Sequence, residues 1–327
     1  MAEFRTFTAI GQREDLSNTI YNIAPTETPV VSSIGKTKAT AVFHEWQTDD
    51  LAAASAAGLK EGDAAGGASD TPTVRVGNRT QIQGKTIHIS GTLDAVDKAG
   101  RKTETAYQLA KAGQELKRDM EKTIMGNQIA VTGTASAARL LASIQTWLLT
   151  NYSSIATGAT AAAPTNGNGT VARTPSSAAQ ATVAFTEGAL KSTVKSCFEN
   201  GGNPTMLVVS PFLKQVVSGF AGIAAQRYEA PTNGSQTTIM GAADVYLSDF
   251  GTLSVVPDRF LTADYAGTGD QAFVLDPTML SIATLRPFQS NLLAKDGDSE
   301  KHQMLSEYTL QVSNQKAHGI VADIKNT

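Results

Sequence analysis

The chain has 327 residues, of which 41% are hydrophobic and 17% charged, and its formal net charge is −3. The apolar share is large enough for a folded core, so a wholly disordered chain is excluded, and the slight acidic excess argues against a surface dedicated to nucleic-acid binding. The single cysteine, Cys197, excludes a disulfide framework and a cysteine-rich zinc site.

The sequence contains no sign of a membrane segment or a cofactor site. No apolar run approaches about 18 residues, the length at which a membrane-spanning helix is considered. The N-terminus lacks a basic region followed by an apolar one, which argues against a signal peptide and for a cytoplasmic place of synthesis. The four histidines have no metal-ligand spacing. We therefore expect no membrane association, no bound metal and no cofactor.

Residues 1–40 predict an extended arm. Pro25 and Pro29 interrupt any helix, and only a short apolar turn is expected at 30–34 before Gly35. Apolar side chains along the arm favour contact with another surface, and these are Ile20, Tyr21, Ile23, Val30, Val31 and Ile34. A frayed terminus is the alternative interpretation.

A hairpin with a long tip is predicted to follow the arm. Residues 42–48 alternate like a strand, and residues 51–71 are almost all Ala, Gly, Ser and Asp. Strand-like residues return at 74–76 and 80–90, and the second of these segments is polar on both faces, so we expect it to lie away from a core. The hairpin is then either an exposed loop or a projection that becomes ordered on a neighbouring subunit.

Residues 104–131 predict the longest helix. Apolar or small residues recur along it at steps of three and four positions, namely Ala106, Leu109, Gly113, Leu116, Met120 and Ile124. At 1.5 Å per residue such a helix spans about 40 Å. This is more than a small domain needs and suits an elongated, flat molecule.

The remaining chain mixes helices with strands. Helices are expected at 140–149, 181–200 and 211–225, and a low-complexity surface loop at 152–180. Strands are expected at 205–210, 244–247, 252–256, 271–275, 280–285, 303–312 and 318–324. Long helices combined with mostly antiparallel strands indicate an α+β fold.

No catalytic motif stands in the context that it requires. Gly-Lys-Thr occurs at 35–37 and 84–86, but the glycine that a phosphate-binding loop needs five residues earlier is absent both times. The sequence Gly167–Ala172 matches a relaxed dinucleotide motif but follows a loop. The acidic residues at 296–300 lack the spacing of a calcium loop. We therefore predict that the chain is not an enzyme.

Three blocks of sequence resemble a known family. They are NTIYNIAPTETPV at 18–30, DVYLSDFGTLSVVPDRFL at 244–261 and AFVLDP at 272–277. With the order of arm, polar hairpin, long helix and returning strands, these blocks make the chain resemble the major capsid proteins of tailed bacteriophages, which have the HK97-type fold.

The resemblance implies an α+β fold with four parts. They are an N-arm (1–40), an E-loop hairpin (41–91), a peripheral P domain with a long spine helix and a sheet (92–133 and 278–315), and a compact axial A domain (134–277 and 316–327).

The resemblance also implies a structural function. Copies of the chain would self-assemble into pentamers and hexamers of an icosahedral head, which encloses double-stranded DNA without sequence-specific binding. The chain would reside in the virion capsid after synthesis and assembly in the host cytoplasm. Its partners would be other copies of itself, together with a separate scaffold, a portal or a decoration protein.

Two alternatives come from other functional classes. A tail-tube subunit is β-rich and usually lacks a helix as long as 104–131. A nucleotide-binding enzyme would have to use the Gly-Lys-Thr segment at 84–86.

The candidate site of a capsid protein is its contact surface with neighbouring copies. The residues expected there are Phe4, Phe7, Ile20 and Tyr21 of the arm and Lys60, Glu61, Asp63, Arg75 and Arg79 of the hairpin. Some relatives cross-link a hairpin lysine to a neighbouring asparagine. Here Lys60 and Lys85 lie in the hairpin, but no feature marks the glutamate that the reaction needs, so we expect no cross-link.

Overall fold

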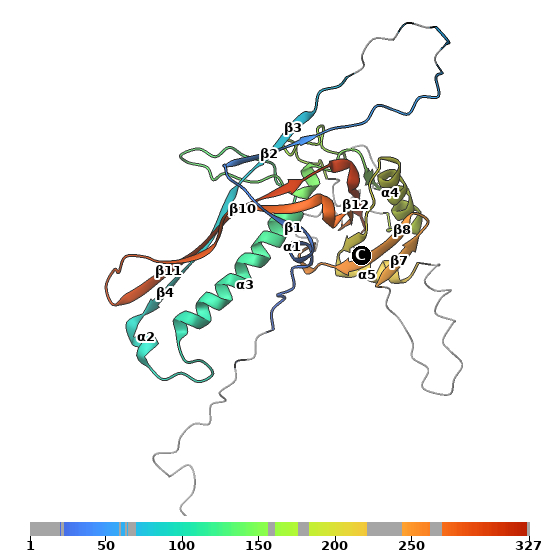
Figure 1. Cartoon of the computed structure of the whole chain (residues 1–327). Helices are drawn as coiled ribbons and strands as arrows, with labels where there is room; N and C mark the ends of the chain where they lie inside the picture. The colour runs from blue at the N-terminus through green and yellow to red at the C-terminus, as the bar shows by residue number, and fades with distance from the viewer. Residues whose placement is uncertain are drawn as a thin grey trace, which may run out of the picture.

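A long helix and a four-stranded sheet form one part of the molecule, and a six-stranded sheet with two helices forms the other (Figure 1). The computed structural model describes residues 20, 23–58, 60–62, 64, 70–155, 161–175, 183–220, 244–261 and 270–325. A two-stranded ribbon and its long tip project from the body. This mixture of helices and sheets agrees with the predicted α+β class.

The four-stranded sheet joins the N-terminal part of the chain to the C-terminal part. In spatial order its strands are β1 (Gly35–Lys38), β10 (Leu280–Leu292), β11 (Ser299–Val312) and β4 (Gln81–Ser90). β1 runs parallel to β10, and the other two pairs are antiparallel. The sheet can therefore form only after distant segments of the chain have met.

The helix α3 (Glu104–Met125) packs against β4 and β11. Leu116, Met120 and Ile124 are buried at four-residue steps, as expected for an amphipathic helix. The short helix α2 (Gly91–Ala95) precedes it, and Asp94 Oδ1 accepts the backbone N–H of Glu104 at 2.8 Å. A residue of α2 therefore satisfies an N–H group that the first turn of α3 leaves unpaired.

The prediction that this helix continues to residue 131 is wrong. It has 22 residues, which corresponds to about 33 Å. Beyond Gly126, the side chain of Asn127 donates to the carbonyl oxygen of Arg173 at 2.8 Å and accepts the N–H of Arg173 at 3.0 Å. The chain is thus fixed to a distant loop at the point where another helical turn would begin.

The six-stranded sheet forms the second part of the molecule. In spatial order its strands are β5 (Tyr152–Ser154), β12 (Gly319–Ile324), β9 (Asp270–Leu275), β6 (Met206–Val209), β8 (Gly251–Pro257) and β7 (Val245–Ser248). Its helices are α4 (Glu187–Glu199) and α5 (Pro211–Ser218). Among the described residues, the two parts also contain the 3₁₀ turns η2 (Ile144–Thr146), η3 (Arg259–Leu261), η4 (Pro277–Met279) and η5 (Gln315–Ala317).

The central strands of this sheet are buried on both faces. In β9, Phe273 and Leu275 belong to one hydrophobic cluster, whereas Ala272 and Val274 belong to another. The same alternation occurs in β6 and in β12 from Ile320 to Ala322. Because successive side chains of a strand point to opposite faces, these strands separate two cores and read as continuous apolar runs.

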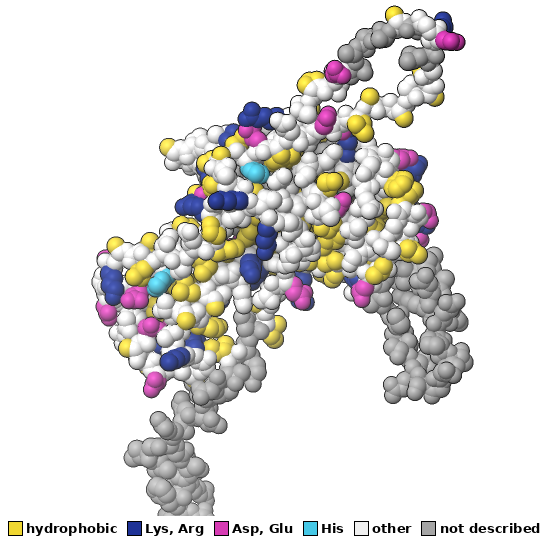
Figure 2. Space-filling model, viewed as in Figure 1, with side chains coloured by type: hydrophobic (Ala, Val, Ile, Leu, Met, Phe, Trp, Pro, Cys, Tyr) yellow, Lys and Arg dark blue, Asp and Glu magenta, His cyan; other side chains and the backbone are white. Residues whose placement is uncertain are grey.

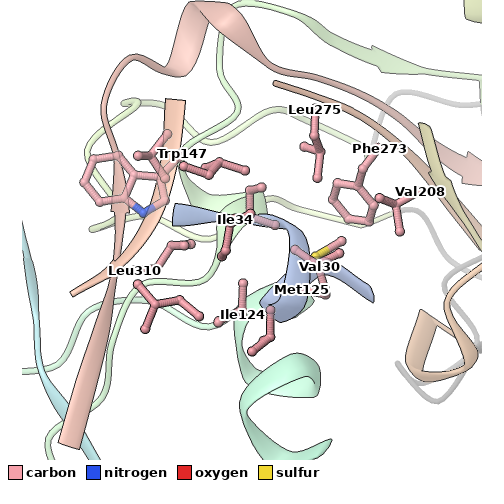
Figure 3. Packing of buried hydrophobic residues seen from close by; sticks show 14 of the residues in the cluster. Val30, Ile34, Ile124, Met125, Trp147, Val208, Phe273, Leu275 and Leu310 are labelled. Atoms are coloured by element: carbon pink, nitrogen blue, oxygen red, sulfur yellow. The ribbon is translucent and has the colours of Figure 1, made fainter. Parts of the chain in front are cut away.

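One hydrophobic cluster connects the two parts of the molecule (Figure 3). The arm contributes Val30, which lies in α1 (Pro29–Ser33), and Ile34, which follows it. The cluster also contains Ile124 of α3, Leu310 of β11 and Phe273 of β9. The second cluster lies between α4, α5 and the opposite face of the six-stranded sheet. The arm segment, the long helix and both sheets consequently share one core.

The projecting ribbon consists of β2 (Phe43–Thr48) and β3 (Val74–Arg79), which pair antiparallel. Figure 1 shows it extending away from the body, with the tip residues at its far end. The two strands that were predicted on either side of residues 51–71 therefore do form a hairpin.

The expectation that 80–90 would lie away from a core is wrong. Most of this segment is β4, which pairs with β11 and packs against α3. Its inward polar side chains have polar partners. Gln83 Nε2 donates to Thr123 Oγ1 at 2.8 Å, and Gln83 Oε1 accepts from Tyr308 Oη at 2.8 Å. Lys85 reaches Asp119 at 3.0 Å. The face of the strand that lies under α3 is polar because Thr123 and Asp119 of the helix offer polar partners.

The predicted helix at 140–149 is reduced to the turn η2. The side chain of Asn78 accepts the N–H of Ala142 at 2.8 Å, and the side chain of Gln81 accepts the N–H of Leu141 at 3.2 Å. These N–H groups are therefore bound by side chains of the ribbon and of β4 and do not enter a helix.

The two other predicted helices are shorter than expected. α4 begins at Glu187 rather than at 181, and the side chain of Thr186 caps it by accepting the N–H of Ala189 at 3.3 Å. α5 ends at Ser218, and residues 221–225 of the predicted helix lie outside the described residues.

Strands occur in all seven predicted segments from residue 205 onward. Two of these strands are longer than predicted: β10 continues to Leu292, and β11 already begins at Ser299. The extra length arises because the two strands pair with each other as a long hairpin. The two Gly-Lys-Thr segments lie in β1 and β4, and neither opens a helix.

We predict that Ile124→Ala lowers the free energy of unfolding of the unassembled subunit by about 2–4 kcal/mol, because a fully buried side chain leaves a cavity in the shared core. Urea denaturation followed by circular dichroism measures the change. As a control, Leu51→Ala at a 98% exposed position should change it by less than about 0.5 kcal/mol. Equal losses for the two variants would contradict the core assignment.

A pH prediction concerns His318, which is buried and accepts the N–H of Asp276 through Nδ1 at 3.1 Å. Burial lowers the pKa of His318 to about 4, because it disfavours the charged ring. The folded state thus holds this ring neutral. The contribution of the neutral ring to the free energy of unfolding is complete above pH 6.5 and is lost as pH falls toward 4.

When pH falls from 7 to 5, we expect His318 to lower the free energy of unfolding by about 2 kcal/mol. Denaturation of the wild type and of His318→Gln at both pH values isolates it, since the variant should lose this part of the pH dependence. His88→Gln, at an exposed position, is the control. An unchanged dependence in His318→Gln would refute the assignment.

Candidate functional site

The described residues hold no arrangement typical of a catalytic centre. Among them, no three His, Cys, Asp or Glu side chains are grouped so that they could hold a metal ion. A groove of about 330 Å³ lies between β4 and α3, lined by Lys85, Ile87, Ile89, Leu93, Ala112 and Glu115, among others. Within the described ranges, no helix is long and apolar enough to cross a membrane.

The base of the projecting ribbon is fixed by Asn78, which is fully buried at the end of β3. Its Nδ2 donates to the carbonyl oxygens of Leu310 at 2.7 Å and of Ala142 at 3.0 Å, and its Oδ1 accepts the N–H of Ala142 at 2.8 Å. One side chain thus joins the ribbon to both β11 and the segment before η2. Sequence reasoning missed this residue, and its only signal was an asparagine in a strand, where asparagine is rare.

A second anchor surrounds the buried Glu307 of β11. Its carboxylate forms ion pairs with Arg139 and with Arg286, the latter at 2.8 Å, and accepts from Thr80 Oγ1 at 2.8 Å. Thr80 lies between β3 and β4, so this cluster ties the root of the ribbon to β10 and β11. Removing the carboxylate would leave two guanidinium groups without their counter-charge.

Within the ribbon, two of the predicted contact residues are engaged by neighbouring side chains. Arg75 forms a bidentate ion pair with Glu45 across the two strands and holds the pKa of that carboxyl below its usual range. The guanidinium of Arg79 lies over the ring of Phe43, 5.0 Å from its centre. Both arginines thus stiffen the ribbon, and their contact with a neighbouring copy stays a prediction.

The ribbon tip and the arm expose apolar side chains away from the body. Leu51 is 98% exposed, and Ile23 of the arm is fully exposed. Burying one such aliphatic side chain would contribute about 1.5–3 kcal/mol. These two segments therefore gain free energy by lying against another surface.

The other predicted contact residues divide into two groups. Ile20 is exposed in the arm, and Lys60 and Glu61 are exposed at the ribbon tip, so all three could reach a neighbour. Phe4, Phe7, Tyr21 and Asp63 lie outside the described residues.

Charge does not concentrate in a single patch on the face shown in Figure 2. Basic and acidic side chains alternate there with apolar ones. Several of the charges are paired on the surface, such as Lys85 with Asp119 and Lys316 with Asp50. Such a surface favours contacts between similar subunits over continuous binding of a nucleic-acid backbone.

Comparisons with known proteins agree on one family. A family model described as the SU10 major capsid protein matches residues 3–325. A major capsid protein of Escherichia phage Phieco32 is 36% identical over 126 residues. That alignment includes 38% of this chain and 36% of the relative, so the chain spans about a third of the length of the curated relative it matches.

Solved structures show the same fold. A chain from Mycobacterium phage Adephagia has a TM-score of 0.58 at 13% identity, and 98% of each chain is covered. A chain from the capsid of a native GTA particle has a TM-score of 0.59 at 11% identity, with 98% of this chain and 97% of that chain covered. Likeness at this level of identity is a likeness of fold, and it confirms the expected HK97-type capsid fold.

We predict that Asn78→Ala lowers the free energy of unfolding by about 2–3 kcal/mol, because it removes the side-chain partner of both backbone groups of Ala142 and one donor to the carbonyl oxygen of Leu310. Urea denaturation of the unassembled subunit measures the loss. Asn203→Ala at an exposed position is the matched control and should be nearly neutral. A neutral Asn78→Ala would show that the anchor at the ribbon base is dispensable.

Proposed function

Because the chain belongs to the SU10 major capsid protein family, we propose that its copies assemble as pentamers and hexamers into an icosahedral phage head that encloses double-stranded DNA. The protein is a phage major capsid protein and a component of the virion capsid. Membership of a structural family confirms that it is not an enzyme, and it removes both the tail-tube and the nucleotide-binding alternatives.

The observation that carries the assembly proposal is the projecting ribbon. Its root is held by Asn78 and Glu307, whereas its tip presents the exposed Leu51 to solvent. A fixed root with the exposed Leu51 beyond it suits a projection that lies on a neighbouring copy. In this proposal the ribbon belongs to the E-loop (41–91) and the segment before α1 to the N-arm (1–40).

The proposal extends to the other two domains. α3 and the long strands β10 and β11 belong to the P domain (92–133 and 278–315), and the six-stranded sheet belongs to the A domain (134–277 and 316–327). The contacts with neighbouring copies fall on Phe4, Phe7, Ile20, Tyr21, Lys60, Glu61, Asp63, Arg75 and Arg79. Wrapping segments add contact area that flat edges lack, although their ordering costs entropy.

The remaining partners are part of the proposal. Net charge −3 and the interspersed charges of Figure 2 support enclosure of DNA without sequence-specific binding. A scaffold, a portal and decoration proteins are further partners, and synthesis and assembly take place in the host cytoplasm.

The decisive experiment removes the ribbon tip. We expect deletion of residues 51–71 to leave a folded subunit, because the anchors at Asn78 and Glu307 remain, but to abolish regular assembly. Purified wild type and variant are fractionated by size at low and moderate salt and imaged by negative-stain electron microscopy. The wild type should give closed shells or rings of five and six subunits, and circular dichroism should show the same helix content in both proteins.

A Gly/Ser replacement of the same 21 positions is the control for tip length. It should also fail to assemble if side chains such as Leu51 make the contact. Normal shells from the deletion would overturn the proposal that the ribbon tip is an intersubunit contact.

A further inference from the structure

A buried ion pair joins the loop that precedes α4 to β12. The side chains of Arg173 and Asp323 are 1% and 0% exposed, and Arg173 Nη1 donates to Asp323 Oδ1 at 2.9 Å. Arg173 Nε also donates to Gln145 Oε1 at 3.1 Å, and Asp323 Oδ2 accepts from Ser154 Oγ of β5 at 2.8 Å. Because a buried charge is costly without a partner, each of the two charged side chains depends on the other.

The backbone of Asp323 departs from that of a regular strand. Its φ is +61°, and among the described residues no other residue except glycine has a positive φ. The pairing of β12 with β9 also shifts here, because Val321 faces Ala272 whereas Ile324 faces Asp270, which leaves one extra residue on β12, as in a β-bulge. A left-handed backbone is unfavourable for a residue with a side chain, so it persists only where its surroundings hold it.

The bulge decides which side chains enter the apolar core. Val321 and Ile324 both belong to the cluster between the six-stranded sheet and its two helices, although residues three positions apart in a regular strand point to opposite faces. Without the bulge, Asp323 would follow Val321 into this cluster. A regular register would therefore bury the carboxylate among apolar side chains, whereas the bulge turns it toward Arg173.

The backbone of Arg173 is itself fixed at the end of the long helix. Asn127 binds both its N–H and its carbonyl oxygen. Gln145, which accepts from the guanidinium group, donates through Nε2 to the carbonyl oxygen of Met125 at 2.9 Å, and Met125 is the last residue of α3. The ion pair therefore connects the C-terminal end of α3 to β12.

We propose that Arg173 is a latch on β12, which holds Asp323 in the bulged conformation and keeps the end of the strand closed. When the latch is removed, the strand opens from residue 322 onward, while the rest of the six-stranded sheet stays folded. Opening brings the carboxylate into water and relieves the left-handed backbone, so it is the alternative to a regular register. The latch is a conformational device of the single subunit and goes beyond the assembly function proposed above, which does not depend on it.

Amide hydrogen exchange of the full-length, unassembled subunit tests the latch by comparing Arg173→Met with the wild type. Two amides report the end of β12, since the N–H of Ile155 donates to the carbonyl oxygen of Ala322 at 3.2 Å and that of Lys325 to the carbonyl oxygen of Val183 at 2.9 Å. We expect their protection to fall about a hundredfold, because the buried carboxylate loses its counter-charge, and protection of β10 and β11 to stay constant. Unchanged protection at both amides, or an equal loss in every strand, would overturn the proposal.

Further variants separate the ion pair from the backbone conformation. Asp323→Asn keeps a residue that tolerates the left-handed conformation but leaves the guanidinium group unpaired, so the same two amides should lose protection. Combining it with Arg173→Met leaves no unpaired charge, and protection should recover about tenfold relative to Arg173→Met alone, or relative to Asp323→Asn if Arg173→Met does not fold. Lys195→Met, which breaks an exposed ion pair with Glu199, is the matched control and should leave both amides unchanged. Additive losses in the double variant would refute the latch.

Discussion

A single hydrophobic cluster determines how the parts of this subunit are placed. Side chains of α1, α3, both large sheets and the segment around Trp147 meet in it. Because protein interiors are close-packed, a shift of one contributor must be accommodated by the others. The long helix therefore cannot turn independently of the arm segment or the six-stranded sheet, and the described parts form one body rather than two loosely joined domains.

Polar side chains at the edge of this core direct the projecting segments. Asn78 and the cluster around Glu307 fix the root of the ribbon, and Glu121 fixes α1. Each uses buried hydrogen bonds, whose loss leaves unsatisfied groups and is therefore costly. The buried hydrogen bonds thus lie at the roots of the arm and the ribbon, whereas the apolar side chains of Ile23 and Leu51 beyond these roots are exposed.

This division suits a shell built from many copies. Each contact can be modest, since association must offset the entropy of ordering both the subunit and its extensions. Low overall charge and the interspersed charges of both signs limit repulsion between copies as they approach.

The sequence alone determined the α+β class, the strands from residue 205 onward, the hairpin and the absence of a catalytic motif, since these depend on local periodicity and spacing. Only the tertiary structure decided where α3 ends, that β4 lies beneath it, and that Asn78, Glu307 and Glu121 are anchors. Each of those outcomes depends on a partner far along the chain: Arg173 for Asn127, Leu310 for Asn78, Val30 for Glu121. Local sequence does not specify such partners, because folding alone brings them within hydrogen-bond distance.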